Sequence, residues 1–320
     1  MRRTYGARNP AWSVRDLPDR AGRTYLVTGA GSGIGYFIAE QLASTGAEIV
    51  LAGRTAERLS TAAATIRGRV PEARLRSLVL DLADLASVRT AVTALDGTPL
   101  DGAVFNAGVL KQRIRRETAD GHELVFGTNH LGHFALGALL LPLMAAGSRY
   151  VTMGSVAARS ARLDLDGPGA RQRLESAAGP YRGFEVYKRS KLAQMTSAFE
   201  LDRRLRAAGS PVASVVAHPG GALDGLTPSR PPVHVRRAAA FLKAVPLAPL
   251  VQGKDAAAWP AVRALLDPEV TGGQLWGPRL ARSRGRPVPE RPTARMLDAA
   301  TGRQLWSLGE EAVGLAWPGL

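Results

Sequence analysis

Tyr187 and Lys191 lie four residues apart in the segment YKRSK, within a stretch of helical periodicity. This spacing places both side chains on one face of a helix, where they can meet at one substrate. A lysine ammonium favours the phenolate over the phenol, so we expect Lys191 to draw the pKa of Tyr187 from about 10 towards neutrality. A phenol tuned in this way can donate or accept a proton. A surface helix that carries the pair without function is the alternative.

A glycine-rich turn, TGAGSGIG at residues 28–35, follows a predicted strand and opens a predicted helix. In this context the pattern is typical of a nucleotide site, in which the second and third glycines let a pyrophosphate approach the backbone and the helix pack on the sheet. The N-terminus of the helix then faces the anion. The residues expected to bind the cofactor here are Gly29, Gly31, Ser32, Gly33, Ile34 and Gly35. A glycine turn without a ligand is the alternative.

The second predicted strand ends in LAGRT. An NAD site typically carries an acidic residue about 20 residues after the glycines, but this chain has Gly53 and Arg54 at that point. Arg54 can hold a 2′-phosphate, and Arg58, one helical turn further on, adds positive charge. We therefore expect NADP(H) to be preferred over NAD(H). A solvent-facing arginine is the alternative.

The elements that must position these residues alternate after Gly22 between short β-rich runs and longer helical segments. This alternation predicts a parallel sheet of βαβ units with helices on both faces, a doubly wound (Rossmann) α/β fold of about seven strands. Ligands of such a sheet bind beyond the carboxyl ends of its strands. Strands are expected near residues 25–28, 48–52, 75–80, 102–105, 150–153, 212–217 and 274–276.

We expect a single domain. It would comprise an N-terminal extension at 1–22, the Rossmann-fold region at 23–278 with a substrate lid near 221–251, and a C-terminal extension at 279–320 packed on the same domain.

Taken together, the motifs resemble the short-chain dehydrogenases/reductases. They are TGAGSGIG, LDLADLAS after the third strand, NAG at 106–108, NHLGHF from residue 129, VTMGS ending at Ser155, YKRSK, and HPG at 218–220. The stretch DGHELVFGTNHLGHFAL, the long gap between Ser155 and Tyr187, and GGQLWGP with a late RQLW are similar to the retinol-dehydrogenase-like branch. The resemblance runs from about Trp12 to the C-terminus, and it implies hydride transfer with a nicotinamide cofactor.

The resemblance also implies roles on the cofactor side. Asp81 would accept a hydrogen bond from the adenine amino group with the Leu82 backbone beside it, and Pro219 and Gly220 would pass under the nicotinamide. The adenosine side would be lined by Asn106, Ala107 and Gly108. Family members commonly have a threonine four residues after the glycine of HPG to hold the carboxamide, whereas this chain has Asp224.

The expected catalytic residues are Asn129, Ser155, Tyr187 and Lys191. Ser155 ends the fifth predicted strand and would hydrogen-bond the substrate oxygen while Tyr187 protonates the developing alkoxide. Lys191 would also hold the nicotinamide ribose, and by resemblance Asn129 would support a water that links Lys191 to solvent. From the residues alone, Asn129 could equally bond locally within a helix, and Ser155 could be a buried structural serine.

Composition excludes several other functions. The 320-residue chain has no cysteine, which removes disulfides and thiolate chemistry, and His130 and His133 have no third ligand beside them, so no metal is expected. The formal net charge is +15, but the arginines are dispersed without a nucleic-acid-binding motif, so no nucleic acid partner is expected. The arginine-rich segment 279–295 is interpreted as solvated surface.

The chain is expected in the cytoplasm, because its basic N-terminus has no apolar run after the charges. Its most apolar segments, 134–146 and 238–251, are shorter than the roughly 20 residues that a bilayer requires, so no transmembrane segment is predicted. The second has Arg236, Arg237 and Lys243 nearby and could make a peripheral membrane contact. A lid over an apolar substrate is the preferred interpretation.

The leading hypothesis is an NADP(H)-dependent oxidoreductase that interconverts a carbonyl and an alcohol on an apolar substrate. Tyr187 would be its general acid/base. The rival is a non-catalytic NADP(H)-binding sensor or scaffold on the same fold, which would have no need of Ser155, Tyr187 and Lys191 together. The residues leave open the substrate and its stereochemistry, the physiological direction and the oligomeric state, for which a homo-oligomer is one option.

Overall fold

The computed structural model describes residues 12–110, 112–176 and 180–320. Its strands form one eight-stranded sheet in the order β3-β2-β1-β4-β5-β6-β7-β8. The first eleven residues of the expected N-terminal extension lie outside the described residues. The strand order changes direction between β1 and β4, which is where a doubly wound sheet opens a crevice for a ligand.

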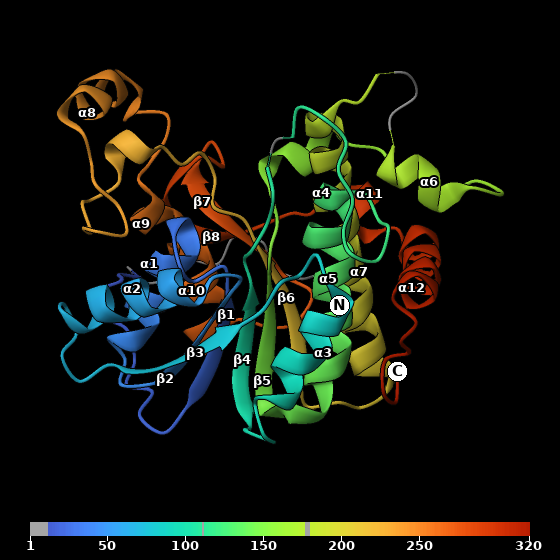
Figure 1. Cartoon of the computed structure of the whole chain (residues 1–320), viewed down its shortest axis with the longest axis horizontal. Helices are drawn as coiled ribbons and strands as arrows, with labels where there is room; N and C mark the ends of the chain where they lie inside the picture. The colour runs from blue at the N-terminus through green and yellow to red at the C-terminus, as the bar shows by residue number, and fades with distance from the viewer. Residues whose placement is uncertain (1–11, 111, 177–179) are drawn as a thin grey trace.

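All seven predicted strands are present, and the doubly wound fold is confirmed (Figure 1). The parallel strands are β1 Thr24–Thr28, β2 Glu48–Gly53, β3 Arg74–Val79, β4 Leu100–Phe105, β5 Met144–Met153, β6 Ala213–Ala217 and β7 Leu275–Leu280. Their apolar side chains alternate between the two faces, so that Leu26 packs with one group of helices and its neighbours Tyr25 and Val27 with the other.

An eighth strand was not predicted. Residues 279–295 are not a solvated segment throughout, because β7 extends to Leu280 and β8 Arg284–Glu290 returns antiparallel beside it. Pro287 and Pro289 count against a strand because they lack N–H groups. They are tolerated in β8 because it pairs only with β7, and an edge strand has one row of backbone groups that needs no partner.

Two layers of helices cover the sheet. The helices on one face are α1 Gly33–Ala43, α2 Ala56–Arg67, α9 Lys254–Ala257 and α10 Trp259–Leu266. Those on the other face are α3 Leu85–Thr93, α4 Leu124–Phe126, α5 Gly132–Leu140, α7 Gly183–Ala207 and α12 Ala299–Val313. The residues between β5 and α7 add the 3-10 turn Val156–Ser160 and α6 Ala170–Glu175, and α11 Ala294–Leu297 lies against α7.

The run Leu124–Leu143 is helical for 20 residues, because α4 and α5 are joined by a π-helical turn at Gly127–Leu131 and continued by a 3-10 turn at Leu141–Leu143. By length and a mean hydropathy of 1.4, this run could cross a membrane, and 83% of its apolar window is buried inside the fold. The apolar segment predicted from the sequence covered only residues 134–146, because the polar side chains of the π-helical turn interrupt the apolar pattern.

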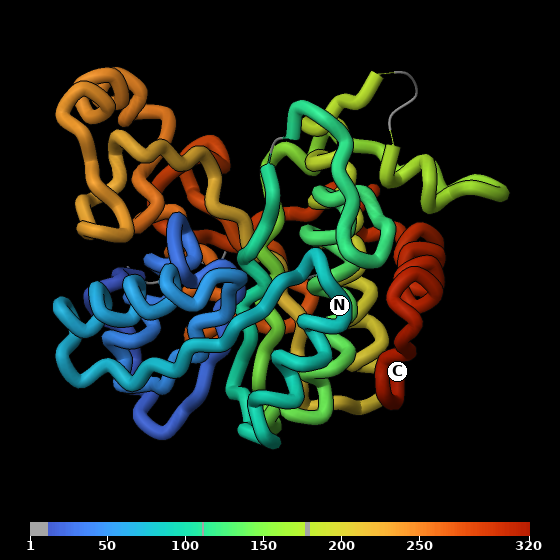
Figure 2. The backbone as a smooth tube through the Cα atoms, viewed as in Figure 1, coloured from blue at the N-terminus to red at the C-terminus, as the bar shows by residue number. Residues whose placement is uncertain are grey.

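The segment expected to be a lid leaves β6 and carries a 3-10 turn at Asp224–Leu226, helix α8 Ala238–Ala244 and a second 3-10 turn at Val245–Leu247. Its two ends meet where Ala222 pairs with Gln252. Figures 1 and 2 show α8 standing away from the sheet, above α1 and α9. The segment therefore projects from the edge of the sheet at which ligands bind.

The C-terminal residues fold back over α5 and α7. Trp306 in α12 and Trp317 beyond it both pack edge-on against Phe134, at ring centroid separations of 5.1 and 5.6 Å. Gly137 lies so close to Trp317 that a Cβ there would meet the indole at 2.6 Å. The last helix therefore completes this side of the core.

Candidate active site

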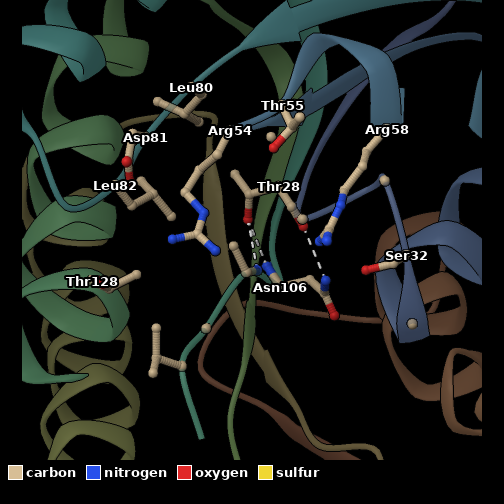
Figure 3. Close-up of a pocket in the computed structure, with 18 of the residues that line it drawn as sticks. Thr28, Ser32, Arg54, Thr55, Arg58, Leu80, Asp81, Leu82, Asn106 and Thr128 are labelled. Atoms are coloured by element: carbon tan, nitrogen blue, oxygen red, sulfur yellow. Dashed lines mark hydrogen bonds between the residues drawn. The ribbon is translucent and has the colours of Figure 1, made fainter. Parts of the chain in front are cut away.

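A cavity of about 470 Å³ lies beyond the carboxyl ends of β1, β2, β3 and β4 (Figure 3). Twelve of the residues expected to bind a cofactor line it: Gly29, Gly31, Ser32, Gly33, Ile34, Arg54, Arg58, Asp81, Leu82, Asn106, Ala107 and Gly108. Tyr187, Lys191, Pro219 and Gly220 do not line it, and Gly35 lies just beneath it. The topology thus gathers most of the expected cofactor residues at one edge of the sheet.

The glycine turn has the backbone that a close ligand requires. Gly29 and Gly33 have φ angles of +70° and +61°, which L-residues rarely adopt. A Cβ on Gly35 would lie 2.3 Å from the carbonyl oxygen of Gly29, so that the start of α1 can approach the turn only with glycine there.

The N-terminus of α1 faces the cavity without a cap. The hydroxyl of Ser32, at the N-cap position, accepts no backbone hydrogen bond, and the first turn of the helix contains no acidic residue. The free amides of a helix start and the positive end of its dipole attract anions. This end of the cavity therefore fits a pyrophosphate.

Two arginines supply positive charge at the cavity. Arg54 follows β2 and Arg58 lies in α2, and Figure 3 shows both side chains reaching into the cavity. Both are exposed, and within the described residues neither guanidinium has a hydrogen bond or an ion pair. Both guanidinium groups are therefore free to bind an anion.

Thr28 ties two strand ends together, and the sequence analysis did not assign it a role. Its hydroxyl accepts hydrogen bonds from the backbone N–H groups of Asn106, at 2.9 Å, and Ala107, at 3.0 Å. The side-chain amide of Asn106 donates to the Thr28 carbonyl oxygen at 3.0 Å. A threonine at the last position of the strand, immediately before the glycines, was the only signal available in the sequence.

The structure brings Ser155 and Tyr187 together. Ser155 follows β5, Tyr187 comes from α7, and their hydroxyl groups are close enough for Ser155 to influence the Tyr187 phenol. Burial raises the pKa of Tyr187, and the hydrogen bond from Ser155 only partly opposes this effect. Phe184 stacks on the Tyr187 ring at 5.9 Å and 16°. The two polar groups that could hold a substrate oxygen therefore lie beside an aromatic surface.

The expected lowering of the Tyr187 pKa by Lys191 is wrong in this structure, where the pKa is raised. Lys191 is only 5% exposed, and its Nζ donates to the Met153 carbonyl oxygen at 2.7 Å and to Gln194 Oε1 at 2.9 Å. Burial lowers the pKa of Lys191 to about 7. Desolvation of both groups outweighs the attraction on which the expectation rested.

Asn129 lies in the π-helical turn, and its side chain does not bond locally within the helix. Its amide donates to the Val109 carbonyl oxygen and to Ser190 Oγ, both at 3.0 Å, and its Oδ1 accepts from the Val109 N–H at 2.7 Å. π-Helical turns frequently occur at functional sites. Asn129 therefore joins the loop after β4 to α7 beside Lys191.

A buried polar chain behind Lys191 was missed by the sequence analysis. Gln194 Nε2 lies 3.3 Å from His133 Nδ1, and His133 Nε2 lies 3.0 Å from Thr28 Oγ1. Burial lowers the pKa of His133 to about 3, so the ring is neutral. This series of polar contacts thus connects Lys191 to the strand end that supports the cavity.

No group of three potential metal ligands occurs among the described residues.

The HPG loop after β6 is held by the unpredicted strand β8. His218 Nε2 and Arg159 Nη2 each lie 2.8 Å from a carboxylate oxygen of the buried Glu290. Burial raises the pKa of Glu290, but the hydrogen bond and charge of His218 and the charges of Arg159 and Arg282 outweigh it, leaving the pKa below its ordinary value. Glu290 therefore fixes the position of the loop.

Asp224 lies beside Lys254, a residue that the sequence analysis did not name. The two side chains form an ion pair. Lys254 lines the main cavity and also an adjoining one of about 400 Å³, which is bordered by Ser32, Gly33 and the base of the lid segment. The cavity therefore carries a third positive charge in addition to the two arginines.

Comparisons with known proteins agree with this geometry. The family model for short chain dehydrogenases matches residues 23–164. Polyprenol dehydrogenase from Mus musculus is 36% identical over 306 residues, which cover 93% of this chain and 86% of that protein. Retinol dehydrogenase 13 from Homo sapiens is 32% identical over 308 residues, with the same coverage of 93% and 86%.

The solved structures include a similar chain. The crystal structure of an uncharacterized protein from Mycobacterium paratuberculosis matches with a TM-score of 0.77 and 33% identity, over 96% of this chain and 99% of that one. The resemblance to the retinol-dehydrogenase-like branch is confirmed by these relatives. The chain belongs to the short-chain dehydrogenase/reductase family, whose members bind a nicotinamide cofactor, and it is an oxidoreductase that acts on CH–OH groups.

Proposed function

We propose that this protein is an NADP(H)-dependent dehydrogenase/reductase that interconverts an alcohol and a carbonyl on an apolar substrate, with Tyr187 as general acid/base. The observation that carries the proposal is the pair of Ser155 and Tyr187, whose hydroxyl groups are close enough to interact. The pair lies at the same edge of the sheet as the cofactor cavity, because β4 and β5 are parallel neighbours. A non-catalytic binding protein would not require this pair.

The proposed cofactor preference rests on Arg54 and Arg58. Two unpaired guanidinium groups, one just after β2 and one in α2, fit a 2′-phosphate. The position after β2 carries no carboxylate that could bind a ribose hydroxyl. The uncapped start of α1 would hold the pyrophosphate, and Asp81 would receive the adenine amino group. When bound, the nicotinamide would supply or accept the hydride.

The proposed proton transfer belongs to Tyr187. Because burial raises the pKa of Tyr187, its phenol is protonated at neutral pH and can donate to a substrate oxygen during reduction. Ser155 would hold the same oxygen from the other side. Asn129 and the Lys191–Met153 contact would fix the part of α7 that carries Tyr187.

The proposed substrate is apolar. Leu110 lines the cavity, Val156 follows Ser155 directly, and Phe184 stacks on Tyr187, and all three are exposed. Each Å² of apolar surface that a substrate buries against them is worth about 25 cal/mol. Two relatives are named for polyprenol and retinol, which supports an apolar alcohol here. We further propose that residues 221–251 act as the substrate lid of a single Rossmann-fold domain.

The test is a panel of alcohols, aldehydes and ketones of increasing apolar length, with oxidation or reduction followed by nicotinamide absorbance in both cofactors. We expect catalytic efficiency to rise with apolar length and to be higher with NADP(H). Tyr187→Phe in the same panel separates enzymatic turnover from background reduction. Cofactor binding without turnover of any substrate would instead favour a non-catalytic binding protein.

A further inference from the structure

The outer part of the lid, residues 235–250, presents an apolar surface to solvent. Val235 is 63% exposed, Leu242 69% and Leu250 64%. Phe241, Val245 and Leu247 are exposed in the same segment. Scattered exposed leucines are common on soluble proteins, but a contiguous apolar surface usually marks an interaction site. We call these residues the outer lid segment.

Helix α8 gains little stability from packing against the rest of the protein. Of its seven residues only Ala244 is buried, against Gly225 of the preceding 3-10 turn. A short helix in water is stabilised mainly by packing of an apolar face, and here most of that face is outside. Figure 2 shows the segment as a loop that projects beyond the body of the protein. The outer lid segment is therefore suited to packing against the surface of another molecule or assembly.

The charged side chains around the apolar surface are all positive. Residues 225–254 contain no aspartate or glutamate, whereas Arg236, Arg237 and Lys243 are exposed among the apolar side chains. The Arg236 guanidinium lies 4.6 Å from the centre of the Phe241 ring, so that a cation and an aromatic ring are presented together. Apolar side chains surrounded by cations are typical of segments that lie at the surface of an anionic bilayer.

A second copy of the chain fits this surface less well. A two-fold contact places the same patch on both partners, so that it would set the three cations of one copy against those of the other. The formal net charge of +15 adds to that repulsion. The positive charge of this segment therefore favours an anionic lipid surface over a second copy of the chain.

We propose that the outer lid segment docks on a lipid surface that carries anionic headgroups. Ala240 of this segment, together with Val233 just before it, lines the cavity that adjoins Ser32 and Gly33. Docking would therefore place the cofactor edge of the protein near the bilayer. Docking itself is independent of the reaction, whereas delivery of an apolar substrate from the bilayer rests on the proposed function.

The first experiment measures flotation of the full chain with vesicles of phosphatidylcholine, alone or mixed with phosphatidylglycerol. We expect binding mainly to the mixed vesicles. The double variant Leu242→Ser/Leu250→Ser should lower the partition coefficient at least tenfold, because it removes two exposed leucine side chains that docking would bury in the bilayer. The matched control is Leu280→Ser/Leu297→Ser, which changes leucines that are 53% and 42% exposed elsewhere and should bind as the parent does.

A second pair of changes tests the charge. Arg236→Ala/Lys243→Ala should lower binding to the mixed vesicles roughly fivefold for each cation lost and should leave binding to phosphatidylcholine unchanged. Equal binding of the parent to both vesicle types would overturn the proposal, as would unchanged binding of the leucine variant. Sedimentation showing a dimer that the leucine variant dissociates would assign the surface to a second copy instead. These measurements need no turnover, so they decide docking even if the proposed reaction fails.

Discussion

Asp224 and Lys254 form an ion pair that joins the two ends of the lid segment beside the cofactor cavity. The backbone N–H of Lys254 also donates to Thr227 Oγ1 at 2.9 Å, which holds the start of α9 against the same turn. Family members commonly have an uncharged threonine where this chain has Asp224. The ammonium of Lys254 therefore compensates a carboxylate that would otherwise repel a phosphate-bearing cofactor.

Lys254→Met should weaken NADPH binding about tenfold, because it removes a cation from the cavity and leaves the Asp224 charge without a partner. Asp224→Asn should bind NADPH at least as well as the parent. The double variant should recover most of the affinity that Lys254→Met loses. Calorimetric titration of all three variants measures the coupling, and equal affinity in Lys254→Met and the parent would show that Lys254 does not act on the cofactor.

Arg54→Asp should weaken NADPH binding by about 1–3 kcal/mol and change NADH binding far less, because only NADPH has the 2′-phosphate. Arg89→Asp on α3 is a control of equal charge change at an exposed position that does not line the cavity. Both cofactors are titrated against each variant by calorimetry. Losses of the same size for the two cofactors would rule out Arg54 as the 2′-phosphate ligand.

Tyr187→Phe should keep the fold and cofactor affinity and lose turnover by at least about 100-fold, the lower end of the effect of general acid catalysis. The change keeps the ring that stacks on Phe184 and removes only the hydroxyl beside Ser155. Circular dichroism and cofactor titration verify the first two expectations, and steady-state kinetics on a validated substrate tests the third. Near-normal turnover would exclude Tyr187 as the proton donor.

Lys191 should make stability depend on pH above neutrality. Its pKa is about 7 in the folded chain, because burial disfavours the charged form, and about 10.4 in an unfolded chain. Between these values the unfolded state binds more protons, so the free energy of unfolding should rise with pH through this window. Urea unfolding at pH 7 and pH 9 should show a larger rise for the parent than for Lys191→Met. A variant with the parent's pH dependence would contradict the buried-lysine assignment.

The sheet could be predicted because most of its seven parallel strands contain buried apolar runs separated by helical segments, whereas β3 has a single buried residue. Strand β8 could not be predicted, since its prolines and arginines are typical of a loop and only pairing with β7 makes them a strand. Most of the residues proposed to bind the cofactor were assigned from the glycine motif, the end of the second strand and the family resemblance, and twelve of them line one cavity. Lys254 was not assigned, because its contact with Asp224 spans the whole lid and forms only when the lid's ends meet.

The pKa of Tyr187 shows another limit of sequence reasoning. The spacing of Tyr187 and Lys191 correctly places both on α7. The sign of the pKa shift, however, depends on how deeply each group is buried and on where the ammonium finds its acceptors. Those acceptors are Met153 and Gln194, and the Met153 carbonyl belongs to a different element of the fold.

Because α12 and the residues after it cover Phe134, the order of synthesis limits when this part of the chain can fold. The apolar run Leu124–Leu143 leaves the ribosome well before Trp306 and Trp317, which pack against it. Until those residues emerge, Phe134 and its neighbours expose a sticky surface of the kind that chaperones bind. Nascent chains that stop before residue 299 should therefore be held by chaperones or aggregate, and this side of the core should be completed only after Trp306 and Trp317 have been synthesised.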